Sequence, residues 1–430
     1  MINNGKVGHV RWGITTLLIF DYIVLYMGRV AMSTAVPALM KQYGWDATQF
    51  GWISTAFFIG YAVTMIPAGW LADRFGGGLV LIFGTLWFCI FTFLTPFGST
   101  LGLMMVIRIL VGIGQGVFVP SNSSILSRWF PKKESGKGMG FLLMGIPIGI
   151  AITMVAASWL LSSFGWKTLF ISFACLGPIW CLFWWKFGKN TPAQHPKISK
   201  EEMDYINSDQ PAAAQAAAGG PELKKSDIFS NFSVWACAIS YFCSNYLFFL
   251  FMTWLPTYFA LGRGIKVSSS LFYSMLPYLV AIITYPLGGT VADIWTKKYG
   301  PNIGRKLGPI IGLALAGVFL LFGTQASNIW MAVGLMSLSN GLLCFTMGSY
   351  FSIPMDFSKK NTGTISGFNG FIGTFAGIVA PVVSGWVIDV SGQYSSALYL
   401  GAAVAVLGAI IMLFARIRPL AGRSKQEDVA

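Results

Sequence analysis

Long apolar stretches with almost no charged residue recur along the whole chain and limit what it can fold into. Of 430 residues, 55% are hydrophobic and only 10% are charged, whereas an ordinary soluble protein has about 25% charged residues. A soluble globule of this size could not cover its surface with so few charges. A stretch of about 20 apolar residues is long enough to cross the hydrocarbon core of a bilayer as a helix. The pattern therefore predicts a polytopic, all-α membrane protein.

The spacing of these stretches predicts twelve transmembrane helices in two groups of six. The expected spans begin at about Trp12 and continue at about 47–72, 79–95, 101–128, 138–161, 166–186, 232–260, 270–292, 307–324, 328–355, 362–388 and 394–415. We expect an N-terminal six-helix bundle over 1–186, a cytoplasmic linker over 187–231, a C-terminal six-helix bundle over 232–417 and a cytoplasmic tail over 418–430. The first span is too long for the apolar core of a cleaved signal peptide and has no A-x-A site. We therefore expect it to be an uncleaved first transmembrane helix.

Basic residues predict how the chain is oriented in the membrane. With the N-terminus inside, most of the 29 Lys and Arg residues fall in inner connectors and tails, and the expected outer loops hold Lys41, Lys167, Arg263 and Lys266. Cytoplasmic loops of membrane proteins carry such an excess of Lys and Arg. We therefore expect both termini to be cytoplasmic, and the net charge of +14 is explained mainly by this bias.

The sequence gives little support to enzymatic or nucleic-acid-binding functions. The six cysteines lie in apolar spans without CxxC spacing, and the two histidines, His9 and His195, lie in polar connectors. Such cysteines are typical of small buried hydrophobic residues rather than metal ligands or disulfides. There is no basic stripe with interleaved aromatics. We expect no catalysis, cofactor, metal site or nucleic-acid partner.

The linker has a charged, helix-like segment, Ile198–Gln210, followed by a low-complexity run, Ala212–Gly220. This composition is typical of flexible tethers that bury little surface. We expect it to separate two halves that move relative to each other.

A repeated motif indicates that the two halves arose by duplication. Gly69–Asp73 and Gly289–Asp293 both read G-x-x-x-D, both end a predicted helix in corresponding halves, and both are followed by basic residues. Two such motifs at matching positions are typical of transporters built from internal repeats.

The motifs resemble those of a known superfamily. Gly69–Gly76 resembles the loop signature of the major facilitator superfamily, and Arg108–Gly112 resembles its fourth-helix R-x-x-x-G. Further stretches resemble the anion:cation symporter family: Arg128–Pro131, Gly165–Lys167, Asn245–Tyr246, Thr253–Tyr258, Gly363–Gly367 and Gly377–Pro381. The resemblance implies a major facilitator fold and a secondary transporter related to bacterial sugar-acid carriers and sialin-type transporters.

Two arginines within predicted spans indicate an anion site. Placing Arg29 or Arg108 in hydrocarbon costs at least about 2.5–3.5 kcal/mol, and both fall at a similar depth below the outer surface. Pairing with a carboxylate is the alternative, but Asp21 is the acid available within the spans of the first half, and eight residues from Arg29 it lies on another helix face. We expect both arginines to hold a substrate carboxylate.

Polar and aromatic neighbours complete the candidate substrate site. Tyr22 and Tyr26 share a stripe with Arg29 on the first helix, and ordinary packing is the alternative for both. The remaining candidates are Tyr61, Gln115, Asn245 and Thr374. Helix–helix hydrogen bonding explains Asn245 about as well as ligand contact does.

The expected coupling machinery departs from the family pattern. Relatives often carry an acid before the first-helix arginine and a Glu on the fourth helix, where this chain has Gly28 and Gln115. Neither residue can carry a proton. Asp21 is the candidate replacement, with a gate-pairing role as the alternative, while Na⁺ coupling and anion exchange also stay open. Asp73, Arg74 and Asp293 are the expected cytoplasmic gate residues.

Together these features predict a secondary transporter that moves a small, sugar-acid-like carboxylate by alternating access. We expect uptake through a bacterial cytoplasmic membrane by a monomer surrounded by lipid, with H⁺ or Na⁺ as possible coupling ions. The alternative is an anion exchanger, or an exporter of anionic amphiphiles, without proton coupling.

Overall fold

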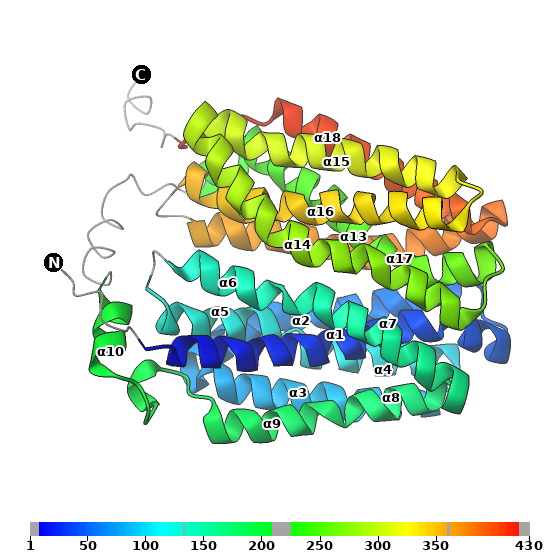
Figure 1. The fold of residues 1–430 in the computed structure, drawn as a ribbon, viewed down its shortest axis with the longest axis horizontal. Coiled ribbons are helices and arrows are strands. Elements are labelled where there is room, and N and C mark those ends of the chain that lie inside the picture. Colours follow the sequence, from blue (N-terminus) through cyan, green and yellow to red (C-terminus); the bar gives the residue numbers. More distant parts are fainter. Residues whose placement is uncertain (1–7, 132–133, 209–224, 359–361, 421–430) are drawn as a thin grey trace. The chain divides into compact units, whose positions relative to one another are not determined.

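A computed structural model describes residues 8–131, 134–208, 225–358 and 362–420, and within them the regular structure is helical. The helices are shown in Figure 1. Their bounds are α1 Val10–Tyr43, α2 Ala47–Phe75, α3 Gly77–Leu94, α4 Leu101–Gln115, α5 Phe118–Trp129, α6 Ser135–Leu143, α7 Gly145–Phe164, α8 Trp166–Ala174, α9 Leu176–Phe187, α10 Lys200–Asn207, α12 Lys225–Phe229, α13 Phe232–Thr257, α14 Val267–Tyr299, α15 Pro301–Gln325, α16 Ile329–Phe357, α17 Thr362–Ser391 and α18 Tyr394–Phe414.

Among the residues that the structure describes, 11 helical segments are long and apolar enough to cross a membrane. The predicted all-α membrane fold is confirmed at this level. The helix α2, with 29 residues, coincides with a further predicted span but is not one of these 11. The count of twelve spans stays a prediction.

Three of the predicted spans are each formed by two consecutive helices, α4–α5, α6–α7 and α8–α9. Each break lies three or four residues before a proline, namely Pro120, Pro147 or Pro178. Proline has no backbone N–H and its ring clashes with the carbonyl four residues earlier, so it interrupts helical hydrogen bonding at that position. These three breaks coincide with prolines, whereas Pro37 and Pro67 lie inside the continuous helices α1 and α2.

The chain forms two compact units that do not follow chain order. Unit 1 comprises Met1–Ala213, Met252–Leu279 and Pro381–Tyr394, and unit 2 comprises Ala214–Phe251, Val280–Ala380 and Ser395–Ala430. Short segments of α13, α14 and α17 thus belong with the N-terminal helices. The division into consecutive bundles expected from the sequence stays a prediction.

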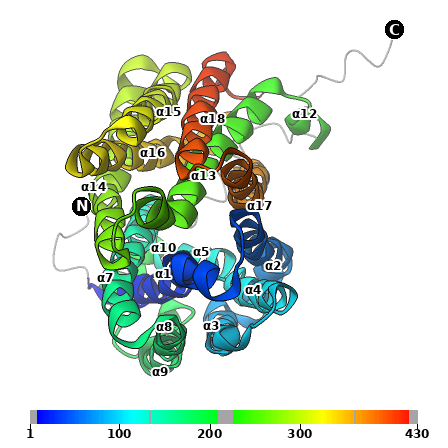
Figure 2. The same cartoon turned by 90° about the vertical axis from the view of Figure 1, so that its right-hand side faces the viewer.

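Unit 1 is assembled around α1 and the paired helices α2 and α4. The helix α1 packs against α6, α7, α8 and α9, and α3 packs against α4, α5, α8 and α9; Figure 2 looks along these helices. In unit 2, α15 pairs with α16. A core in the same unit joins α13, α16 and α18 through residues such as Cys237, Tyr350 and Met412.

Glycines bring α2 and α4 into backbone contact. A Cβ on Gly60 would overlap the carbonyl oxygen of Ile109, and a Cβ on Gly112 would overlap that of Phe57. Small residues permit such close helix crossings in membranes. The crossing fixes Phe57 and Tyr61 of α2 beside the face of α4 that carries Arg108.

The expectation that the linker buries little surface is wrong for α10. The carboxylate of Glu202 is fully buried and accepts hydrogen bonds from the backbone N–H groups of Val10 and Arg11 and from the Arg11 guanidinium, each at 3.1 Å. Arg11 also lies 3.6 Å from Glu134. The first N–H groups of a helix have no partner within it and attract negative charge. Glu202 supplies that partner to α1, so α10 is held at the N-terminal end of this helix (Figure 1).

We expect Glu202→Gln to lower the thermal stability of the purified protein by several degrees, because removing one partner of a buried ion pair costs about 3–5 kcal/mol. Trypsin cleavage after Lys197 and Lys200 should become faster as α10 detaches. The matched control is Glu201→Gln, which removes the same charge from an exposed position on the same helix. Equal melting temperatures for the two variants would contradict this role of Glu202.

Candidate functional site

Arg29 lies in the middle of α1 with its guanidinium among neutral groups. Only 8% of the residue is exposed. Its Nε donates to Oε1 of Gln115 at 3.2 Å, and its Nη1 lies 3.5 Å from the Tyr26 hydroxyl. The guanidinium carbon lies 4.8, 5.0 and 4.9 Å from the ring centroids of Tyr26, Phe57 and Tyr61. These rings offer the negative faces that attract a cation, but none carries a charge.

Arg108 lies on α4 and is only 2% exposed. Its guanidinium carbon lies 5.3 Å from the centroid of the same Phe57 ring. Within the described part of the chain, its Nε and Nη1 have no hydrogen-bond partner. A buried cation without a partner is costly. The group is therefore available to a ligand.

Both arginines line one small cavity within unit 1. The other lining residues are Met32, Ser33, Ser54, Phe57, Phe58, Met252 and Thr253. The cavity measures about 20 Å³, which is room for about one water molecule. The cavity combines two cations, aromatic walls and three hydroxyl side chains, which are groups that can bind an anion.

The tyrosines predicted for the site lie next to Arg29 or next to one another. Tyr26 and Tyr61 both contact Arg29, and Tyr22 stacks on Tyr26 with a centroid distance of 6.4 Å. The predicted stripe on α1 is therefore present in the structure. Tyr22 lies one turn further from the cavity than Tyr26.

Gln115 is fully buried and joins α4 to α1. Its Oε1 accepts from Arg29, and its Nε2 donates to the backbone oxygen of Leu25 at 3.2 Å. The amide thus places Arg29 without neutralising it. A carboxylate at this position would neutralise the charge, and here the chain has none.

Asp21 lies away from the arginines, as the helix geometry predicts. It is fully buried, and its Oδ1 accepts from the Thr85 hydroxyl of α3 at 3.5 Å, while Oδ2 has no partner among the described residues. No ion pair to Asp21 is present in the described part of the chain. This geometry does not support the gate-pairing alternative in this conformation.

Asn245 and Thr374 belong to unit 2, where α13 and α17 meet. Asn245 donates through Nδ2 to the backbone oxygen of Tyr241 at 2.9 Å. A Cβ on Gly373, next to Thr374, would lie 3.0 Å from that nitrogen. The structure therefore places Gly373, the chain neighbour of Thr374, beside Asn245.

The predicted gate residues have separate surroundings. The side chain of Asp73 lies outside the described residues. Arg74 is exposed, with its guanidinium over the Trp70 and Phe75 rings at 5.1 and 5.4 Å. Asp293 pairs with Arg305 at 2.7 Å, and Arg305 pairs with Asp356 at 2.9 Å. Asp293 thus joins a charge network within unit 2.

A polar contact that the sequence did not predict links α17 to the N-terminus of α2 within unit 1. Asp389 of α17 accepts from the backbone N–H of Ala47 at 3.1 Å, from that of Thr48 at 2.6 Å and from the Thr48 hydroxyl. It thereby caps the N-terminus of α2, where negative charge is favoured. Trp254 adds a hydrogen bond to the backbone oxygen of Pro381 at 3.3 Å.

Some lining residues of the cavity were also missed. Phe57, Phe58 and Ser54 lie in an apolar span whose periodicity does not single them out. Thr253 begins the Thr253–Tyr258 motif and could have been selected from it. It enters the cavity because the Met252–Leu279 segment packs within unit 1.

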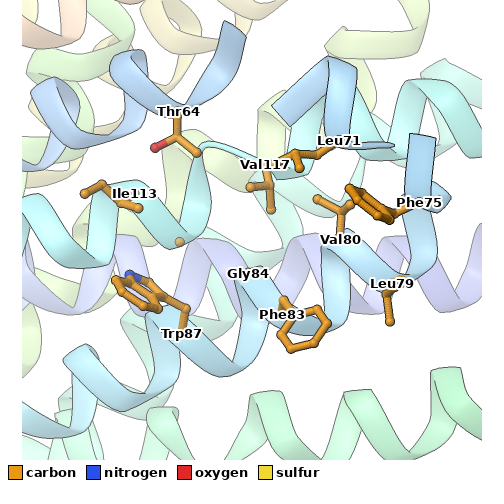
Figure 3. A pocket seen from close by; sticks show the side chains of 11 residues that line it. Thr64, Leu71, Phe75, Leu79, Val80, Phe83, Gly84, Trp87, Ile113 and Val117 are labelled. Atoms are coloured by element: carbon orange, nitrogen blue, oxygen red, sulfur yellow. The ribbon is translucent and has the colours of Figure 1, made fainter. Parts of the chain in front are cut away.

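A larger hollow in unit 1, of about 480 Å³, has a different character (Figure 3). Its walls come from α2, α3, α4 and the start of the α4–α5 connection, and include Leu71, Phe75, Phe83 and Trp87. Phe83 and Phe75 are 66% and 50% exposed. With no charged side chain in its lining, this hollow does not suit an anion.

The structure thus combines membrane-length helices with a small cavity lined by two buried arginines. The family model of the Major Facilitator Superfamily matches residues 18–381. The chain belongs to the major facilitator superfamily, whose members are multi-pass membrane transporters rather than enzymes.

Relatives within the superfamily are anion transporters. The chain is 31% identical over 405 residues to the chloroplastic ascorbate transporter of Arabidopsis thaliana, with 93% of this chain and 74% of the relative covered. It is 28% identical over 405 residues to the hexuronate transporter of Bacillus subtilis, with 93% of each covered. The resemblance to anion carriers is confirmed.

Solved structures show the same fold. A bacterial homologue of the human lysosomal transporter Spinster, in an inward-facing conformation, matches with a TM-score of 0.73 at 15% identity, over 95% of this chain and 96% of the other. A D-xylose–proton symporter matches with a TM-score of 0.68 at 16% identity, over 95% and 98%.

Proposed function

We propose that this protein is a secondary transporter of a small organic anion, and that Arg29 and Arg108 hold the anionic group. The observation that carries the proposal is the buried guanidinium of Arg108, whose Nε and Nη1 lack partners in the described chain while it lines a cavity beside Arg29. An anionic ligand would satisfy these donors with strong charge-assisted hydrogen bonds. The printed names of the relatives, hexuronate and ascorbate transporters, support an organic acid.

The proposal includes twelve transmembrane helices, two six-helix bundles over 1–186 and 232–417, cytoplasmic termini and alternating access. In this topology the Asp389 contact with α2 lies at the outer end of unit 1. Alternating access would require that contact to break when the cavity opens outward. We propose uptake across a bacterial cytoplasmic membrane by a monomer.

The coupling step is proposed to use Asp21, not the positions occupied by acids in relatives. Asp21 is buried, with one long hydrogen bond and no ion pair among the described residues, so it can gain or lose a proton without breaking a salt bridge. Anion exchange is the second candidate, favoured by the neutral side chain of Gln115 beside Arg29. A pH-sensitive dye inside vesicles separates the two, because only proton-coupled uptake acidifies the vesicle lumen.

The function is tested by thermal shift against a panel of organic acids, followed by counterflow in proteoliposomes. We expect at least one acid to raise the melting temperature of the wild type and to drive exchange of its labelled form. Stabilisation should disappear in Arg29→Met and Arg108→Met. An acid that still stabilises both variants would contradict the proposed site, and binding without counterflow would indicate a sensor.

A further inference from the structure

We infer that the anion bound by Arg29 and Arg108 carries two negative charges on a compact skeleton. This inference rests on the proposed function and narrows its substrate class. It starts from the charge balance of the cavity. The ion pairs in the described chain involve Arg11 and Arg305, and none reaches Arg29 or Arg108.

No described carboxylate compensates the charge of either arginine. Arg29 contacts an amide, a phenol and three aromatic rings, all neutral. Arg108 contacts the Phe57 ring and has two N–H donor atoms without partners in the described chain. Asp21 lies on another face of α1 and hydrogen-bonds to Thr85. Among the described residues, the site thus contains two buried cations and no carboxylate paired with either.

Because the two arginines are buried, the affinity of a ligand should depend on how many negative charges it carries. The two residues are 8% and 2% exposed, so water screens their charges poorly. A singly charged ligand would leave one cation uncompensated in a dry cavity, which is costly. A doubly charged ligand would neutralise the site.

The geometry limits the size and the polarity of the ligand. Both guanidinium carbons lie beside the same Phe57 ring, at 5.0 and 5.3 Å from its centroid, so the two cations are held near one another. The lining offers the hydroxyls of Ser33, Ser54 and Thr253, and the Ser33 hydroxyl donates to the backbone oxygen of Val30 at 2.8 Å. The Gln115 amide is engaged at both ends. Few groups are therefore left to bind a row of sugar hydroxyls. The chemistry of the lining suits a short dicarboxylate better, although the cavity of about 20 Å³ must widen to admit one.

The test compares each dianion with a singly charged partner of the same skeleton. Malonate, succinate and glutarate are paired with their monomethyl esters, and binding to the purified full chain is measured by calorimetry at pH 7, where all free carboxyls are ionised. We expect at least one dianion to bind tenfold or more tightly than its ester. Esters that bind as tightly as the diacids would overturn the charge inference while leaving an organic-anion transporter in place. Binding of other acids in the thermal-shift panel but of no dicarboxylate would also overturn it.

A substitution at Gln115 tests the same point from the protein side. Gln115→Glu places a carboxylate where Oε1 now lies 3.2 Å from Arg29, so the cavity then needs one ligand charge fewer. We expect the diacid-to-ester affinity ratio to fall at least tenfold. Gln115→Met is the matched control, because it removes the hydrogen bonds without adding charge and should weaken both ligands alike. An unchanged ratio in Gln115→Glu, or an equal fall in Gln115→Met, would overturn the inference.

Discussion

Replacing Arg108 with methionine is expected to abolish anion binding and transport while leaving the protein as stable as the wild type or more so. Removing one member of a buried, hydrogen-bonded charge pair costs about 2–5 kcal/mol of binding free energy, which is roughly thirtyfold or more in Kd. Among the described residues, the Nε and Nη1 of Arg108 have no hydrogen-bond partner. Methionine fills much of the same volume without a buried charge. Calorimetry and proteoliposome uptake measure binding and transport, and a thermal melt measures stability.

The control for this prediction is Arg418→Met, which removes the same charge from an exposed position and should change neither transport nor stability. Arg108→Lys should retain part of the affinity, because it keeps the charge but loses the planar donor fork of arginine. A sharp loss of stability in Arg108→Met would show instead that the arginine is structural.

Replacing Gly112 with leucine is expected to prevent correct folding. A side chain there would overlap the backbone of Phe57, and α2 and α4 would have to move apart along their crossing. Forcing extra atoms into a packed interface typically costs about 1–3 kcal/mol, and a collision with backbone, which cannot rotate away, should exceed that range. We expect little monodisperse protein on size-exclusion chromatography after membrane extraction.

Gly102→Leu is the matched control on the same helix. A Cβ at Gly102 meets nothing within 4 Å, so this variant should be produced and should transport normally. Equal yields of the two variants would show that the α2–α4 crossing is not as tight as the structure indicates.

The two arginines could be predicted from the sequence because an ionised group in an apolar span has few structural explanations. Phe57 could not be selected in this way, since one phenylalanine among many in an apolar helix has no distinguishing pattern. Its position beside both guanidinium groups depends on glycines that let α2 and α4 meet.

The linker contains a buried residue that its composition did not predict. Glu202 lies in a segment whose composition is typical of a solvated tether. It is nevertheless fully buried, because it accepts hydrogen bonds from the first N–H groups of α1 and from the guanidinium of Arg11. Composition records how polar a segment is. It does not record which unsatisfied donors lie beside that segment in the fold.

The sequence by itself determined that this is a helical membrane protein and indicated its superfamily, since these follow from hydropathy and local motifs. It also determined which charged groups lie at membrane depth. Only the tertiary structure decided that Arg29 and Arg108 share one cavity and that Gln115 orients Arg29 without neutralising it. The reason is physical: charge compensation depends on distances of a few ångströms between side chains on different helices, and packing alone sets those distances.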